Sequence, residues 1–254
     1  MFFINLLETN LQTHLLGKKI IYYTVTDSTN DDIWELVEEG ESPGLIVIAD
    51  SQKKGKGQRG NVWFSKPGHG IICSFLLSQK LENLNSNLYS LVIPIGIING
   101  IHKLLNIELN IKWPNDIYYK NKKIGGILIE TKSKKEEIIF NIGIGINVNE
   151  SLEDFPDELQ NTAQSIKIIL DKPVQRELLL AYILNDIDQL LRNFNLDYLI
   201  NTYNDRCISI NNKVSFKYNN KLETGILKEI TQKGHALIEY ENQLIISNGV
   251  IVNT

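Results

Sequence analysis

Apolar residues follow two different periods along this chain, and the alternation between them predicts that helices and strands succeed one another. Short runs rich in β-branched and aromatic residues are typical of strands. In the first 210 residues or so we predict strands at 20–24, 45–49, 71–77, 111–117, 123–130 and 138–149. Apolar positions three and four residues apart predict helices at 6–16, from Asn30 onward, at 88–105, 174–194 and 196–206.

From Asn211 onward the pattern changes to short strands alone. We predict them at 214–216, 223–227, 236–240 and 244–247, separated by Asn, Gly and Lys turns. Such strands are typical of a small β-barrel of SH3 type formed by roughly the last 45 residues. A chain of 254 residues is long enough for one large core with a small domain appended. We therefore expect one domain at 1–208 and a second at 209–254.

Composition and charge narrow the class of protein. A net charge of −4 argues against a dedicated nucleic-acid binder, because neutralising phosphates usually requires a basic face. Cys73 and Cys207 form no C-x-x-C pair, so neither a zinc site nor a disulfide framework is indicated. The apolar run at 1–7 is too short for a secretory signal or a membrane span. We expect a cytoplasmic protein without membrane contact.

Residues 50–64 form a glycine-rich basic loop, D-S-Q-K-K-G-K-G-Q-R-G-N-V-W-F, directly after a predicted strand. In this loop the glycines Gly55, Gly57 and Gly60 alternate with the cations Lys54, Lys56 and Arg59. Glycine at this density lets successive backbone N–H groups turn inward around an anion, while the cations supply charge. A flexible solvated loop is the alternative. Trp63, at the end of the loop, is interpreted as core or as the wall of a pocket.

Two further polar stretches allow either a structural or a binding role. Ser28-Thr29-Asn30 follows a predicted strand and precedes a helix, where one residue would cap the helix and the others could face a ligand. Lys123 begins a strand that contains Gly125 and Gly126, which are costly there unless something approaches the backbone. The Lys123 ammonium could reach a carboxylate or phosphate, or could simply be exposed in a turn.

Five motifs in this order resemble those of the biotin protein ligase family. They are S-T-N at 28–30, G-K-G-Q-R-G at 55–60 followed by W-F at 63–64, K-W-P-N-D at 112–116, K-I-G-G-I-L-I-E at 123–130 and G-I-G-I-N-V-N at 143–149. The match extends along nearly the whole chain. The resemblance implies an α+β fold with a mixed or antiparallel sheet of the biotin/lipoate ligase type, followed by an SH3-like barrel.

The resemblance implies an enzyme that joins biotin to biotin carboxyl carrier protein in two steps. Biotin would be activated by ATP with Mg²⁺ to biotinyl-5′-AMP, and a lysine of the carrier domain would then attack the activated carbonyl. Positioning and charge stabilisation would supply most of the catalysis. Such a protein is expected as a monomer or a homodimer.

The resemblance also assigns roles to individual residues. Lys123 and Arg59 would be catalytic, with Lys123 at the carboxylate and α-phosphate, where negative charge concentrates. Biotin would be bound by Ser28, Thr29, Asn30, Gln52, Lys56, Gly57, Gln58, Trp63, Lys123, Gly125 and Gly126. The nucleotide would be bound by Lys56, Gln58, Trp113, Asn115, Asp116 and Asn147, the last four also facing its Mg²⁺, although no metal ligand is assigned with certainty.

Two departures from the family pattern carry expectations of their own. Many members have arginine where this chain has Lys56 and Gln58, so we hypothesise that it retains its adenylate less tightly. Only about 19 residues precede the first predicted strand, too few for the DNA-binding domain of bifunctional relatives, so no DNA binding is expected. The alternatives are a lipoate or octanoate ligase, whose run of consecutive glycines is absent here, and a non-enzymatic biotin- or nucleotide-binding module.

Overall fold

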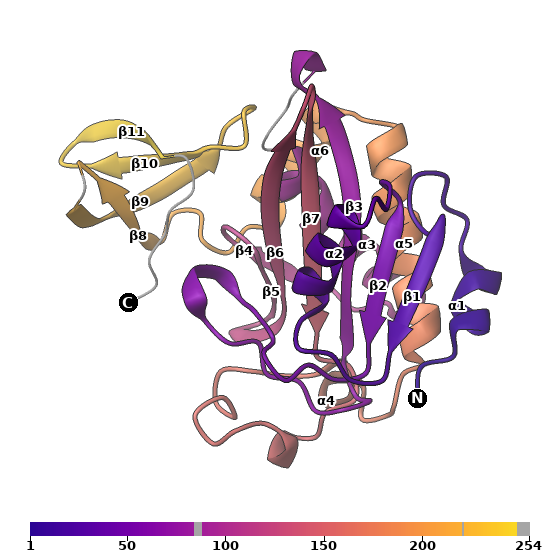
Figure 1. Cartoon of the computed structure of the whole chain (residues 1–254). Helices are drawn as coiled ribbons and strands as arrows, with labels where there is room; N and C mark the ends of the chain where they lie inside the picture. The colour runs from indigo at the N-terminus through magenta and orange to yellow at the C-terminus, as the bar shows by residue number, and fades with distance from the viewer. Residues whose placement is uncertain (84–87, 220, 248–254) are drawn as a thin grey trace.

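The structure is a computed structural model that describes residues 1–83, 88–219 and 221–247. Its centre is a seven-stranded sheet with the order β1-β2-β3-β7-β6-β5-β4 (Figure 1). These strands are β1 (Lys19–Tyr23), β2 (Leu45–Ala49), β3 (Ile71–Lys80), β4 (Asn110–Lys112), β5 (Asp116–Tyr119), β6 (Lys122–Lys134) and β7 (Glu137–Ile146). β1 and β2 run parallel and the other neighbours are antiparallel, which confirms the predicted mixed sheet.

The helices lie on both sides of this sheet. They are α1 (Ile4–Asn10), α2 (Thr29–Glu38), α3 (Leu88–Leu105), α4 (Ile166–Leu170), α5 (Arg176–Arg192) and α6 (Leu196–Arg206). Three single turns of 3-10 helix add η1 (Gln58–Gly60), η2 (Leu81–Asn83) and η3 (Leu152–Asp154). α3 packs on α5 behind the sheet, whereas α2 lies in front of β2, β3 and β7 (Figure 1). No helix within the described ranges is long and apolar enough to cross a bilayer.

Two apolar cores result from this layering. Ile46 and Ile48 of β2 belong to the larger core, which includes α3 and α5. Leu45 and Val47 point the other way and pack with Ile33 of α2. Because both faces are covered, every residue of β2 is buried, and this is why the strand is a continuous apolar run in the sequence. The front face, which carries α2, also carries the site described below.

The long predicted helix at 88–105 is confirmed, but the helix predicted at 6–16 ends at Asn10. The backbone N–H groups of His14, Leu15 and Leu16 donate to Oδ1 of Asp188 at 3.0, 2.6 and 3.2 Å. A buried carboxylate on α5 thus accepts from amides that would otherwise continue the helix. Apolar periodicity cannot detect such a competitor, because the carboxylate is far away in sequence.

The C-terminal strands form a separate four-stranded antiparallel sheet of order β11-β10-β9-β8, drawn at the left of Figure 1. They are β8 (Lys213–Tyr218), β9 (Lys221–Ile230), β10 (Ala236–Tyr240) and β11 (Gln243–Ser247). Within the described residues β11 and β8 are not hydrogen-bonded to each other, so the predicted barrel is open there; residues 248–254 lie outside the description. Asn204 of α6 connects this sheet to the helix, because its side chain accepts from the Ile230 backbone N–H and donates to the Ile230 carbonyl.

Candidate active site

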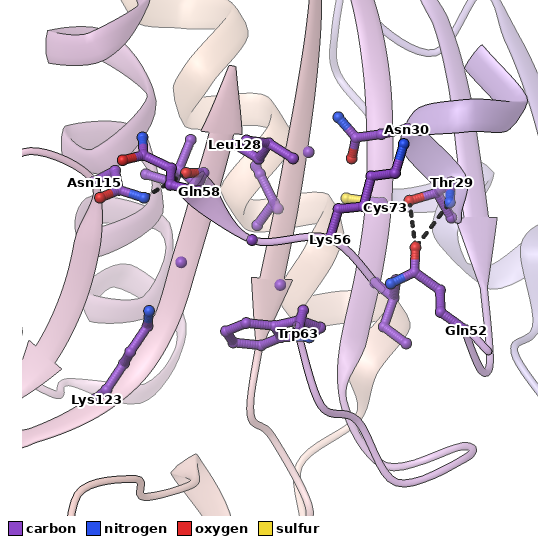
Figure 2. A pocket seen from close by; sticks show the side chains of 17 residues that line it. Thr29, Asn30, Gln52, Lys56, Gln58, Trp63, Cys73, Asn115, Lys123 and Leu128 are labelled. Carbon is purple, nitrogen blue, oxygen red and sulfur yellow. Dashed lines mark hydrogen bonds between the residues drawn. The ribbon is translucent and has the colours of Figure 1, made fainter. Parts of the chain in front are cut away.

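Two neighbouring cavities lie on the front face of the main sheet. The inner cavity, of about 50 Å³, lies between α2, the glycine-rich loop and strands β3, β6 and β7 (Figure 2). The outer cavity, of about 160 Å³, lies beyond Trp63. Trp63 and Lys123 line both cavities and therefore form the boundary between them.

The start of α2 provides a polar end to the inner cavity. Gln52 Oε1 accepts from the Thr29 backbone N–H at 2.8 Å, and the side chains of Thr29, Asn30 and Gln52 line the cavity (Figure 2). Ser28 stands at the N-cap of α2 as predicted, but its side chain makes no cap hydrogen bond. Among the residues that the structure describes, the buried Ser28 hydroxyl has no hydrogen-bond partner, and it does not line the cavity. Of the three residues of the motif, two are therefore in direct reach of a ligand.

A surface without side chains forms the floor of the inner cavity. Gly126 of β6 pairs with Gly145 of β7, and Gly143 lies two residues before Gly145 on the same face. A Cβ at Gly145 would lie 2.4 Å from the Trp63 ring, and one at Gly143 would lie 2.2 Å from Asn30 Oδ1. Only glycine allows the ring and the amide to approach the strand this closely. Gly125, in contrast with the prediction, does not line this cavity.

The glycine-rich loop covers the inner cavity, to which it contributes Lys56, Gly57 and Gln58. Trp63 N donates to Gly55 O at 2.9 Å, which closes the loop on itself. Lys56 forms an ion pair with Asp31 at the surface of α2. The side chain of Arg59 lies outside the part of the chain that the structure describes, so its predicted catalytic role stays a prediction.

Lys123 lies at the junction of the two cavities. Its Nζ is 2.7 Å from Asp116 Oδ1 and 5.7 Å from the centre of the Trp63 ring. Its backbone is fixed as well, because Lys123 N donates to Thr162 O at 2.7 Å. Asn115 lines the inner cavity beside it and donates to Ile127 O at 2.7 Å. Lys123 is half-buried within β6, so it is not the exposed turn lysine of the alternative interpretation, and its catalytic role stays a prediction.

The outer cavity has mainly aromatic and apolar walls. Phe64, Tyr118, Phe155 and Leu159 line it together with Asn147, whose Nδ2 donates to Gln164 O at 3.2 Å. Flat rings are suited to such walls. Trp113, which was predicted to face a nucleotide, is 5% exposed within the larger apolar core and lines neither cavity.

Several lining residues were not identified from the sequence. Gly143 and Gly145 belong to the G-I-G-I-N-V-N motif but were assigned no role there, although their spacing of two places both on one face of β7. Phe155 and Leu159 come from a segment that gave no signal, and it is the pairing of Lys123 with Ala163 that brings them to the site. Cys73 also lines the inner cavity, but burial raises the pKa of its thiol to about 12, so it is not a nucleophile at neutral pH.

The arrangement can hold two different ligand groups side by side. A ring with hydrogen-bonding atoms fits the polar end and glycine floor of the inner cavity, and a flat ring fits the outer one. The Lys123 ammonium, at the junction, would attract negative charge from both. Such geometry suits a reaction in which two bound molecules are joined through anionic groups.

Comparison with known proteins gives a consistent result. Residues 22–149 match the model of the biotin/lipoate A/B protein ligase family. The bifunctional ligase/repressor BirA of Bacillus subtilis is 33% identical over 185 residues, and the match covers 72% of this chain and 57% of that protein. The human biotin--protein ligase is 32% identical over 207 residues, with 76% of this chain and 28% of that protein covered. The chain thus spans little more than half the length of the bacterial relative.

A solved structure agrees over nearly the whole chain. The biotin protein ligase from Aquifex aeolicus in complex with biotin and ATP has a TM-score of 0.78 and 29% identity, covering 92% of this chain and 98% of that one. With the family match over half of its length, the chain belongs to the biotin/lipoate A/B protein ligase family.

Proposed function

We propose that this chain activates biotin with ATP as biotinyl-5′-AMP and transfers the biotinyl group to a lysine of a biotin carboxyl carrier domain. The observation that carries the proposal is the polar end of the inner cavity beside a glycine floor. A ureido ring has two N–H donors and one carbonyl acceptor, and Thr29, Asn30 and Gln52 provide both kinds of partner. The similarity to a ligase solved with biotin and ATP supports the same assignment.

The polar end also argues against lipoate and octanoate as substrates. A dithiolane or alkyl chain would offer no acceptor to the N–H groups that buried Asn30 and half-buried Gln52 retain beyond their internal hydrogen bonds. Leaving such groups unpaired costs about 1–3 kcal/mol each, so a cavity built for hydrogen bonding rejects an apolar ligand of similar size.

In the first step, an oxygen of the biotin carboxylate attacks the α-phosphorus of ATP, and the bond from that phosphorus to the pyrophosphate oxygen breaks. Lys123 Nζ lies where the carboxylate in the inner cavity would meet the phosphate between the cavities. Its charge would stabilise the negative charge that gathers there in the transition state. The adenine ring would occupy the outer cavity, against Tyr118 and Phe155.

The second step joins the carboxyl group to the acceptor lysine. The neutral amine attacks the activated carbonyl, the bond from that carbon to the phosphate oxygen breaks, AMP leaves, and the amine proton passes to solvent. Mg²⁺ would arrive with the ATP phosphates, and it typically uses only one or two protein carboxylates. Asp116 is suited to this, because its carboxylate lies beside Lys123 at the same junction.

The loop that covers the inner cavity must move before biotin can enter. A free volume of about 50 Å³ is well below the roughly 300 Å³ that ligand pockets usually provide. Two ion pairs of the loop, Lys54 with Asp27 just before α2 and Lys56 with Asp31 on α2, are exposed to solvent. Exposed ion pairs contribute little to stability, but Lys53 N and Lys54 N also donate to the carbonyls of Thr26 and Asp27, so we expect opening to be confined to the part of the loop after Lys54. The proposed division into domains 1–208 and 209–254 places this loop entirely within the first domain.

ATP–pyrophosphate exchange tests the proposal. Purified protein is assayed with biotin, lipoate or octanoate as the added acid, and Lys123→Ala is compared with Lys120→Ala, an exposed lysine of the β5–β6 turn. We expect exchange that requires biotin, survives in Lys120→Ala and falls by at least about a hundredfold in Lys123→Ala. Exchange with lipoate or octanoate in place of biotin would assign the site to the other branch of the family. No exchange with any acid would refute an adenylating enzyme.

A further inference from the structure

Two fully buried polar side chains lie behind the polar end of the inner cavity. Ser74 of β3 and Asn141 of β7 are both 0% exposed, and neither lines the cavity. Ser74 Oγ lies 2.7 Å from Thr29 Oγ1 and 3.0 Å from Asn30 Oδ1. The Asn141 side chain contacts Asn30 twice, accepting from the Asn30 side chain and donating to the Asn30 backbone carbonyl. They form a second layer that touches the proposed ligand-binding residues and no ligand.

The direction of each hydrogen bond in this layer follows from the backbone. Asn141 Nδ2 donates to the carbonyl of Asn30 at 2.8 Å, which can only accept. The Oδ1 of Asn141 is therefore left for the Asn30 side chain, which must present its Nδ2 at 3.4 Å. Asn30 Oδ1 then faces Ser74, whose hydroxyl must donate to it. The orientation of the Asn30 amide is thereby fixed from both sides.

The hydroxyl protons of Ser74 and Thr29 can be assigned to acceptors in the same way. The Ser74 hydroxyl has used its one proton on Asn30, so it accepts from Thr29 Oγ1 at 2.7 Å. The single hydroxyl proton of Thr29 takes this shorter contact in preference to Gln52 Oε1 at 3.1 Å. Gln52 Oε1 is already bound by the Thr29 backbone N–H. Both hydroxyl protons and one N–H of each side-chain amide thus have one assigned acceptor, and the chain of bonds has a single direction.

We propose that Ser74 and Asn141 are positioning residues that lock the Asn30 amide in one orientation and thereby select a ligand ring with an acceptor at the position facing the Asn30 N–H. This inference rests on the proposed function and names what determines specificity at the same site. After its internal bonds, Asn30 retains one Nδ2–H and one lone pair on Oδ1 for a ligand. If the amide could turn over, donor and acceptor would exchange places and the selection would be lost.

The test uses two ligands that differ at one atom. Biotin has a carbonyl oxygen in its ureido ring, whereas 2-iminobiotin has there the nitrogen of a cyclic guanidine that is protonated near neutral pH, so an acceptor becomes a charged donor. The ratio of kcat/KM for biotin to that for 2-iminobiotin is measured by ATP–pyrophosphate exchange in wild type, Ser74→Ala and Asn141→Leu. Each variant removes one of the two contacts that oppose rotation of the Asn30 amide.

Ser165→Ala is the matched control, because Ser165 is also 0% exposed and its hydroxyl makes two hydrogen bonds away from the cavity. We expect the ratio to fall about tenfold in Ser74→Ala and Asn141→Leu, and to stay at the wild-type value in Ser165→Ala. An unchanged ratio in both variants, with wild type still active on biotin, would overturn the positioning role alone. Absence of biotin-dependent exchange in wild type would overturn the proposed function and this inference together.

Discussion

Glu150, just after β7, is a buried carboxyl group whose ionisation should oppose folding. The residue is 1% exposed, and neither carboxylate oxygen has a hydrogen-bond partner in the described structure. A Cβ at Gly70 would lie 2.9 Å from its Oε1, so the group is enclosed closely by backbone. Burial is the main cause that raises the pKa of Glu150 from 4.5 to about 7, and the Asp154 charge contributes in the same direction, whereas the nearby backbone N–H groups of Glu150 and Val148 and the Arg176 charge oppose the rise.

The sign of the pH effect follows from this raised pKa. Between pH 4.5 and 7 the folded protein keeps a proton on Glu150 that the unfolded chain has lost. Stability contributed by this group is therefore full below pH 4.5 and is lost as the pH rises towards 7. With about 1.4 kcal/mol per pKa unit, the loss by pH 8 is on the order of 3 kcal/mol.

Glu150→Gln replaces the carboxyl by a neutral group of the same shape. We expect urea unfolding to show near wild-type stability at pH 5, where Glu150 is mostly protonated, and a gain of about 2–3 kcal/mol over wild type at pH 8. Glu153→Gln, at an exposed neighbouring position, should change little at either pH. A stability difference between Glu150→Gln and wild type that is equal at pH 5 and pH 8 would refute the reasoning.

Three further predictions concern the floor, the loop and the N-terminal segment. Gly145→Ala should raise KM for biotin at least about tenfold with the fold retained by circular dichroism, because the new Cβ would lie 2.4 Å from Trp63; an unchanged KM would contradict the glycine floor. Gln58→Arg should slow the dissociation of biotinyl-AMP severalfold in a chase experiment, because a guanidinium adds charge-assisted hydrogen bonds; an unchanged rate would disprove the hypothesis of weak retention. Burial alone would raise the pKa of Asp188, but hydrogen bonds from backbone amides and from Arg192 outweigh burial and lower that pKa. The ionised carboxylate therefore stabilises the fold above about pH 4, and this contribution is lost as the pH falls. Asp188→Asn should therefore cost about 2 kcal/mol in urea unfolding at pH 7 and less at pH 3, and an equal cost at both would contradict this assignment.

Local signals in the sequence were sufficient for the elements that depend on their own residues. The apolar period over 88–105 predicted α3 with its observed ends. The strand predicted at 123–130 lies within β6, and the glycine-rich loop was placed correctly after β2, whereas the single strand predicted at 111–117 is divided into β4 and β5. Thr29, Asn30, Gln52 and Lys123 were all expected at the site, and all line the inner cavity. In each case the information lies within a few neighbouring residues, which is the range over which propensity and spacing act.

The sequence alone determined the local elements, the basic glycine loop and the set of motifs that identifies the family. Only the tertiary structure decided which groups meet. It stops α1 at Asn10 with a carboxylate from α5, and it makes a floor of Gly126, Gly143 and Gly145 through the register of β6 on β7. It also sets Asn141 behind Asn30, 111 residues earlier in the chain. The physical reason is that strand register and buried hydrogen bonds join distant residues, and periodicity describes only how each segment faces the core.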